Sequence, residues 1–162
     1  MDLEVRSAFI DDADAIAKVH VDGWEATYRG VIEDDVLDRL TVTRRSQHWA
    51  EALAHNLPAW IAVDANTVVG FAAVRADELS ALYVSPHVYG QGIGTILLEE
   101  AERYIAEDGI STALLWVHEK NTRSQHWYTK RGWQKTDELE AHRIGDLDTG
   151  RAVKMIKPLH NA

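Results

Sequence analysis

Runs of apolar residues and their spacing predict a chain that alternates strands and helices. Residues 3–8 alternate apolar and polar side chains, as a half-buried strand does. A final strand is expected at 152–157, after a turn at 148–150. The run at 112–117 is nearly all apolar, which is typical of a strand buried on both faces. Three further apolar runs predict strands near 59–63, 68–74 and 79–86.

Between these strands, apolar residues recur at helical spacing. One helix is expected to begin at an aspartate N-cap within residues 11–14 and to bury a face that includes His20 and Trp24. The clearest helix covers residues 92–108, where positions 93, 97, 98, 101 and 105 form one apolar stripe and Gly109 ends it. Shorter helices are expected near 33–40, 43–55 and 122–131. The pattern predicts a single α/β domain over residues 1–162, with a central mixed sheet flanked by helices.

Composition agrees with an ordinary globular domain. The chain has 162 residues, enough for one hydrophobic core, and 46% of them are hydrophobic. It has no run of 18 apolar residues, so no membrane-spanning helix is expected. The N-terminus lacks a basic region followed by an apolar stretch, so no signal peptide is expected either. We therefore expect a cytoplasmic protein.

Charge and cysteine content exclude several classes of function. Asp and Glu outnumber Lys and Arg by 26 to 17, and a net charge of −9 repels the phosphates of nucleic acids. The same acidity keeps a protein soluble and suits attraction of a cationic amine. The chain contains no cysteine, which excludes disulfides and a cysteine acyl-enzyme. His118, His126 and His142 fall in different predicted elements with no ligand spacing between them, so no metal site is expected.

A glycine-rich turn, Gly90-Gln91-Gly92-Ile93-Gly94, joins the strand at 79–86 to the helix at 92–108. Glycines at this place let backbone N–H groups approach a ligand, and the following helix N-terminus favours negative charge. The turn therefore has the outline of a pyrophosphate cradle, although a purely structural turn is an equal alternative at this point. No lysine follows Gly94, which excludes a Walker A loop. Thr95 stands where a dinucleotide fingerprint needs its third glycine.

Two more segments favour one cofactor over the others. The strand at 79–86 ends in a proline, Pro86, and residues 121–133 read Asn-x-x-Ser-x-x-x-Tyr-x-x-x-Gly-Trp. Together with the turn, they resemble the GCN5-related N-acetyltransferase (GNAT) family over roughly residues 3–158. The family's turn motif is Arg/Gln-x-x-Gly-x-Gly/Ala; Gly92 and Gly94 match it, and Tyr89 replaces the leading Arg/Gln.

The resemblance implies that acetyl-coenzyme A is the acyl donor. In the family, the turn binds the pyrophosphate, and the strand before it pairs its exposed backbone with the pantetheine arm. The residues at matching positions are Leu82, Tyr83, Val84, Tyr89, Gly90, Gln91, Gly92, Ile93, Gly94, Thr95, Asn121 and Ser124.

The resemblance also implies catalytic roles. Tyr128 would donate a hydrogen bond or a proton to the departing thiolate; a tyrosine packed in the core is the alternative. Glu78 would act as the base that deprotonates the amine. The alternative is a solvated carboxylate at the start of its strand, without a catalytic role. Glu25 and Tyr28 would border the acceptor site. The alternative is that Glu25 is only a surface charge and Tyr28 only a packed aromatic ring.

The function implied is transfer of an acetyl group to a primary amine by direct attack within a ternary complex. The acceptor would be a small-molecule amine or a protein N-terminus, with no nucleic-acid or membrane partner. A homodimer is an open expectation, since many relatives pair. The alternative function is a binding module of the same fold that holds an acyl-coenzyme A as a sensor without turnover.

Overall fold

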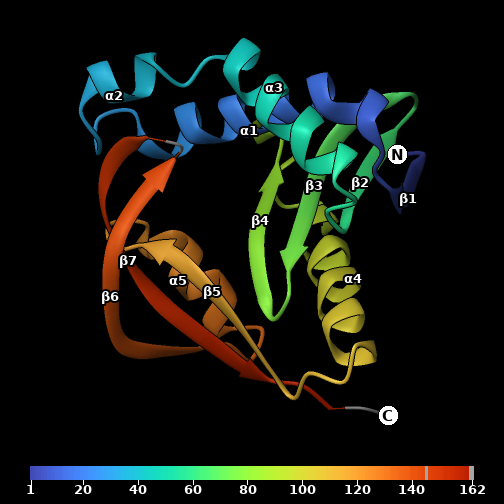
Figure 1. The fold of residues 1–162 in the computed structure, drawn as a ribbon, viewed down its shortest axis with the longest axis vertical. Coiled ribbons are helices and arrows are strands. Elements are labelled where there is room, and N and C mark those ends of the chain that lie inside the picture. Colours follow the sequence, from blue (N-terminus) through green and yellow to red (C-terminus); the bar gives the residue numbers. More distant parts are fainter. Residues whose placement is uncertain (145, 161–162) are drawn as a thin grey trace.

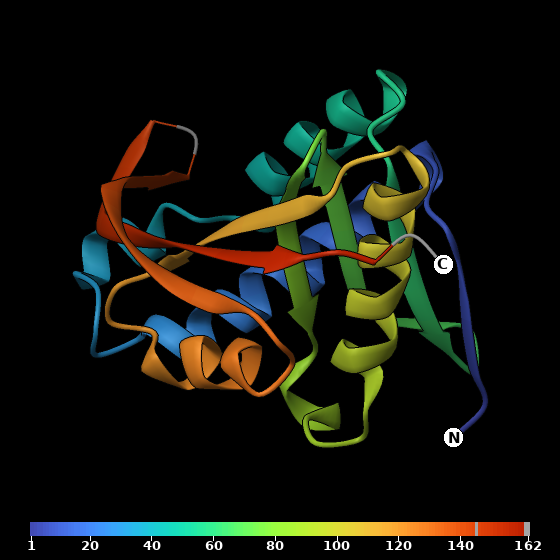
Figure 2. The same cartoon turned by 90° about the horizontal axis from the view of Figure 1, so that it is seen from below.

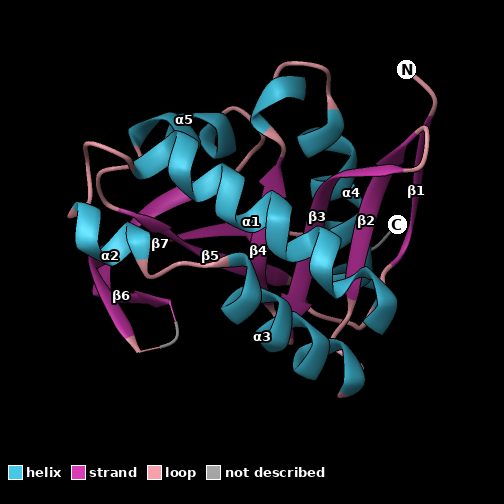
Figure 3. Cartoon of the chain, turned by 90° about the horizontal axis from the view of Figure 1, so that it is seen from above, coloured by secondary structure: helices cyan, strands magenta, loops and turns pink. Residues whose placement is uncertain are grey.

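The computed structural model describes residues 1–144 and 146–160, and Figures 1 and 3 show a sheet with helices on both faces. None of the described helices is both long enough and apolar enough to cross a lipid bilayer. In chain order the strands and helices are β1 (Leu3–Ser7), α1 (Ala13–Tyr28), α2 (Asp34–Asp38), α3 (Val42–Ala54), β2 (Ala59–Asp64), β3 (Thr67–Arg75), β4 (Glu78–Val84), α4 (Ile93–Glu107), β5 (Thr112–His118), α5 (Thr122–Thr129), β6 (Gln134–Ile144) and β7 (Leu147–Pro158).

The seven-stranded sheet has the order β1-β2-β3-β4-β5-β7-β6, and all neighbours are antiparallel except β4 and β5. This confirms the mixed sheet predicted from the sequence. The parallel pair is held only at its beginning, where Glu78 is in register with Leu114. There the Leu114 N–H donates to the Asp77 carbonyl at 2.9 Å. From this point β4 and β5 run in different directions (Figure 2), which leaves one backbone edge of β4 without a strand partner.

Helices cover the two faces of the sheet separately. In Figures 2 and 3, α1 and α3 lie on one face and α4 on the other. The apolar stripe predicted for α4 is fully buried against the sheet, because its side chains recur at the helical period on one side. On the opposite face, Ile16 of α1 and Trp49 of α3 pack with Phe71 of β3. Strand β3 is therefore buried on both faces, and β4 pairs beside it.

The predicted turn at 148–150 is wrong, since these residues lie inside β7. His142 of β6 is in register with Gly150 and Arg143 with Asp148, with a register shift between the two pairs. Gly150 has a φ of 116°, and its N–H donates to the Asp148 carboxylate at 3.0 Å. A β-bulge uses the same residue types as a turn, which explains the misassignment. The long, mostly exposed strand β6 was not predicted because its outer face carries too few apolar residues to show alternation.

The beginning of α1 also differs in detail from the prediction. Asp12 is the N-cap residue, but its side chain makes no capping hydrogen bond to the helix. Its carboxylate instead accepts from the Arg6 guanidinium at 2.9 and 3.0 Å and from the Phe9 N–H at 2.9 Å. The aspartate therefore ties β1 to the start of α1 rather than satisfying helix N–H groups.

Candidate active site

A cavity of about 610 Å³ opens beside the end of β4, where this strand has left β5. Its walls come from β4, the glycine-rich turn, the first turn of α4, the segment from Lys120 through α5, and α1. Every residue that the sequence predicted for donor binding lines this cavity, apart from Gln91, whose side chain is exposed on the turn. Tyr128 lines it as well. The fold thus gathers three separate segments around one space.

The glycine turn has the backbone geometry that only glycine adopts without strain. Gly90 and Gly92 have φ angles of 80° and 82°, in the left-handed region. A Cβ built on either residue would meet no other atom within 4 Å, so the protein leaves the space beside them open. Gly92 is the N-cap of α4 and provides no side-chain cap. The first N–H groups of α4, which a helix cannot pair internally, therefore belong to the cavity wall.

The charged side chains of the cavity wall are all basic, although the chain as a whole is acidic. They are Lys120, Arg123 and Arg131, and no Asp or Glu lines the cavity. Arg131 is fixed from two sides: its Nε donates to Thr95 Oγ1 at 3.2 Å, and its Nη1 donates to the Trp127 carbonyl at 3.0 Å. Its guanidinium also lies 3.9 Å from the centre of the Trp127 ring. The cavity is therefore suited to an anionic ligand.

Tyr128 is almost completely buried on α5, between the rings of Trp127 and Trp133. Burial, with a smaller contribution from Tyr28, raises the pKa of Tyr128 well above its usual value. The hydroxyl keeps its proton at neutral pH and can donate a hydrogen bond into the cavity.

Asn121 begins α5 and serves two purposes. Its Oδ1 accepts from the Ser124 N–H at 3.1 Å, which is the side-chain cap of the helix. Its Nδ2 donates to the Tyr28 hydroxyl at 3.2 Å and so links the cavity wall to α1. Asn121 and Ser124 thus lie together on the cavity wall, as their spacing indicated.

The structure places the two predicted acceptor residues outside the cavity wall. Tyr28 packs against the Trp24 ring at 4.4 Å and the His118 ring at 5.3 Å, and burial raises its pKa to about 12. Glu25 is exposed, and both of its carboxylate oxygens bind the guanidinium of Arg29.

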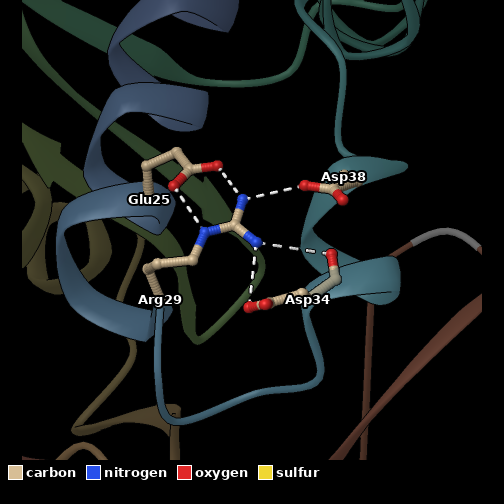
Figure 4. Close-up of polar contacts among 4 residues, drawn as sticks. All are labelled: Glu25, Arg29, Asp34 and Asp38. Atoms are coloured by element: carbon tan, nitrogen blue, oxygen red, sulfur yellow. Dashed lines mark hydrogen bonds and ion pairs between the residues drawn. The ribbon is translucent and has the colours of Figure 1, made fainter.

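Arg29 is the centre of an ion-pair network that connects α1 with α2 (Figure 4). Besides Glu25, its guanidinium binds the carboxylates of Asp34 at 3.1 Å and Asp38 at 3.0 Å. The Glu25 carboxylate is therefore held by a cation of the protein itself. The i,i+4 spacing of Glu25 and Arg29 is visible in the sequence, whereas the links from Arg29 to Asp34 and Asp38 are not, since these two belong to a different helix.

Glu78 lies at the narrow end, where β4 and β5 are still paired, and outside the cavity wall. Its side chain is half-buried, and burial is the main cause that raises its pKa, followed by the nearby Glu140 and Asp77. Like charges and a drier environment both disfavour the ionised carboxylate.

Several residues of the site were not singled out in the sequence. Trp127, Arg123 and Lys120 line the cavity without matching a motif position. The spacing of Trp127 and Arg131, one helical turn apart, was the one sequence signal for their stacking. His118 and His142, from distant elements, have ring centres 5.3 Å apart, and the described residues contain no group of three or more metal-binding side chains.

Comparisons with known proteins show the family of this chain. A profile of the acetyltransferase (GNAT) family matches residues 21–133. An uncharacterized N-acetyltransferase of Bacillus subtilis, YuaI, is 32% identical over 127 residues, which cover 72% of each chain. A spermidine N(1)-acetyltransferase of Thermoplasma acidophilum is 27% identical over 150 residues, covering 85% of this chain and 91% of that protein.

The fold matches solved structures over almost the whole chain. A GCN5-related N-acetyltransferase of Rhodopseudomonas palustris superposes with a TM-score of 0.84 at 20% identity, covering 98% of this chain and 97% of that one. The chain belongs to the acetyltransferase (GNAT) family. It is accordingly an acetyltransferase with acetyl-coenzyme A as its donor, as the motifs implied.

Proposed function

We propose that the protein transfers the acetyl group of acetyl-coenzyme A directly to a primary amine bound beside it. The observation that carries this proposal is the composition of one cavity wall. It combines the uncapped N-terminus of α4, three basic side chains and no acidic one with the protonated hydroxyl of Tyr128. Such a wall suits a ligand with phosphates at one end and a reacting group at the other.

The residues of the cavity fit the two halves of the donor. Backbone N–H groups at Gly92 and Gly94, together with Arg131, are placed to bind the pyrophosphate. The backbone of Leu82 and Val84 lies on the part of β4 that has separated from β5, so it is available to pair with the amides of the pantetheine arm. Acetyl-coenzyme A supplies an activated thioester; every other group needed for the transfer belongs to the protein or the acceptor.

Tyr128 is the proposed hydrogen-bond donor to the departing sulfur. A thiol has a reference pKa near 8.5, and the pKa of Tyr128 lies above its usual value near 10. Full proton transfer from Tyr128 to the thiolate is therefore uphill. Tyr128 instead stabilises the thiolate by donating a short hydrogen bond to its sulfur. The Val84 N–H on the free edge of β4 is the proposed donor to the oxyanion that forms on the acetyl carbonyl.

The base and the acceptor site form the other half of the proposal. Glu78 has a raised pKa, which makes it a stronger base than an ordinary carboxylate, and its place outside the cavity wall requires that it act through water. The acceptor approaches from the side of Tyr28 and Glu25, next to the hydrogen bond between Tyr28 and Asn121. The similarity to a spermidine acetyltransferase supports a small amine, and a protein N-terminus is the other candidate.

Two measurements test this function in sequence. Acetyl-coenzyme A at about 100 times its dissociation constant should stabilise the fold by about 2.7 kcal/mol, which is readily seen in thermal unfolding. With an amine acceptor identified by thiol release, Tyr128→Phe should then lower kcat by about 100-fold and leave the Kd for acetyl-coenzyme A unchanged.

The matched control is Tyr104→Phe, which removes a hydroxyl from an exposed tyrosine of α4 outside the cavity wall. It should retain the activity of the wild type. Unchanged turnover in Tyr128→Phe would refute the role of Tyr128. Binding of acetyl-coenzyme A without acetylation of any amine tested would favour the sensor function instead.

A further inference from the structure

We propose that Arg123, held over the ring of Tyr89, is a phosphate-binding residue of the donor site. The inference rests on the proposed function, because it assigns a further contact to the same ligand. Arg123 lies in the first turn of α5, and Tyr89 lies just before the glycine turn. Their contact joins the two flanks of the cavity, and both residues line it.

The first argument is that the charge of Arg123 is not neutralised by the protein. Arg29, Arg103 and Arg151 all pair with carboxylates of this acidic chain. Within the described residues, Arg123 makes no ion pair, and no carboxylate lines the cavity beside it. A cation that faces a cavity without a counter-charge produces a local positive potential, which attracts an anion.

The second argument is that the N–H groups of Arg123 are available. Arg131, the neighbouring arginine of the cavity wall, uses its Nε and Nη1 for Thr95 and the Trp127 carbonyl. In contrast, the described hydrogen bonds include none from the Arg123 guanidinium, whose contact is with the face of Tyr89, 5.2 Å from the ring centre. A guanidinium stacked in this way keeps its in-plane donors free, and their fork matches two phosphate oxygens.

The third argument concerns the position of Tyr89. Its side chain is 39% exposed, and its ring lies under the guanidinium of Arg123 at 5.2 Å from the ring centre. The next residue, Gly90, has a φ of 80° and begins the turn that we assign to the pyrophosphate. A guanidinium resting on Tyr89 therefore lies beside the chain segment that binds the phosphates. Tyr89 acts as a positioning residue, and Arg123 makes the contact with the ligand.

The test compares two substitutions that each remove one positive charge, at opposite ends of α5. Arg123→Gln removes the proposed contact. Lys130→Gln is the matched control, since Lys130 is the C-cap of α5, is exposed and does not line the cavity. In calorimetric titration with acetyl-coenzyme A, Arg123→Gln should raise Kd by about 10- to 100-fold, the loss expected for a hydrogen bond to a charged group. Lys130→Gln should change Kd by less than about twofold.

The salt dependence of Kd is a second readout, which would not change if Arg123 had only a structural role. Binding by the wild type should weaken steeply as salt increases from 0.05 to about 0.5 M, since salt screens the attraction between exposed charges. Arg123→Gln should have a shallower dependence, because one of the attracting charges is absent. The unliganded melting temperature of the variant should equal that of the wild type, since the side chain is exposed.

Variants of Tyr89 test the positioning role. Tyr89→Leu removes the ring face and should weaken binding in the same direction as Arg123→Gln, whereas Tyr89→Phe, which keeps the ring, should weaken it less. In the double variant the two losses should not add, because the residues act as one unit. Tyr89→Arg in the Arg123→Gln background returns a guanidinium to the same end of the cavity and should restore part of the affinity.

The outcomes separate this inference from the proposed function. A wild type that binds acetyl-coenzyme A and an Arg123→Gln variant that binds it equally well would overturn the role of Arg123 alone. An equal loss in Lys130→Gln would also overturn it, because the effect would then come from net charge. A wild type that does not bind acetyl-coenzyme A at all would instead show that the proposed donor site is wrong.

Discussion

Two glycines that flank α4 allow the proposed role of the glycine turn in donor binding to be tested with an internal control. Gly92 precedes the helix with a φ of 82°, and Gly109 follows it with a φ of 83°. A Cβ on either residue would meet no other atom within 4 Å. The two sites thus share backbone strain and open surroundings, and they differ because Gly92 lines the cavity whereas Gly109 does not.

The expected loss of stability is the same for Gly92→Ala and Gly109→Ala. Forcing an L-residue into the left-handed region costs about 1–2 kcal/mol. For a chain of this size, each kcal/mol lowers the melting temperature by about 2–4 °C, so both variants should melt about 2–8 °C below the wild type. Equal melting temperatures would show that the two variants are matched in stability.

Binding should distinguish the two variants. At Gly92 the added methyl group would enter the open space beside the turn, where the proposed function places a phosphate of the donor. Loss of one hydrogen bond to a charged group costs about 1.5–3 kcal/mol, which corresponds to a Kd for acetyl-coenzyme A about 10- to 100-fold higher. Gly109→Ala should bind as the wild type does. If calorimetry gives equal affinities for the two variants, the turn is structural and does not bind the donor.

Two further predictions concern titratable groups. The pKa of Glu78 is raised by burial and by Glu140 and Asp77, so Glu78 favours the fold when protonated, and this contribution is lost as pH rises through its folded-state pKa. Glu78→Gln should therefore melt higher than the wild type at pH 7 and converge with it below the unfolded-state pKa near 4; a variant that melts lower at pH 7 would contradict this. Burial lowers the pKa of His20 to about 3, with smaller contributions from Arg45 and His48. The contribution of neutral His20 to the free energy of unfolding is therefore complete above pH 6.5 and decreases toward pH 3, by up to about 1.4 kcal/mol per pH unit. His20→Gln should reduce this slope in urea unfolding measured at several pH values, and an unchanged slope would show that another group titrates.

Much of the fold could be predicted from the sequence, because the spacing patterns that indicate helices and strands are local. The stripe of α4 and the apolar strands β3 and β5 follow from spacing alone, since each element buries one or both faces against a neighbour. Exposed strand β6 was not recognised, because a strand that packs weakly on one side leaves little alternation. The bulge in β7 was predicted as a turn for a related reason: Asp and Gly satisfy the same local backbone needs in both.

The site could be predicted only in part. Gly92 and Tyr128 occupy motif positions, and a spacing in the sequence is enough to identify them. Glu25 and Arg29 have the i,i+4 spacing of a helical ion pair, but the sequence does not show that Asp34 and Asp38 share Arg29, because they come from another helix. The stacking of Arg123 on Tyr89 was equally hidden, since it depends on how α5 lies beside the glycine turn.

The sequence by itself determined the order of most elements and the glycine turn, and its motifs implied the donor through a family resemblance. The elements and the turn depend on residues within a few positions of each other, whose contacts are set by the periods of helix and strand. The tertiary structure alone decided where β4 leaves β5, which cations surround the cavity and which carboxylates are kept away from it. Charges act through space, so the potential of the cavity depends on which side chains the fold brings together.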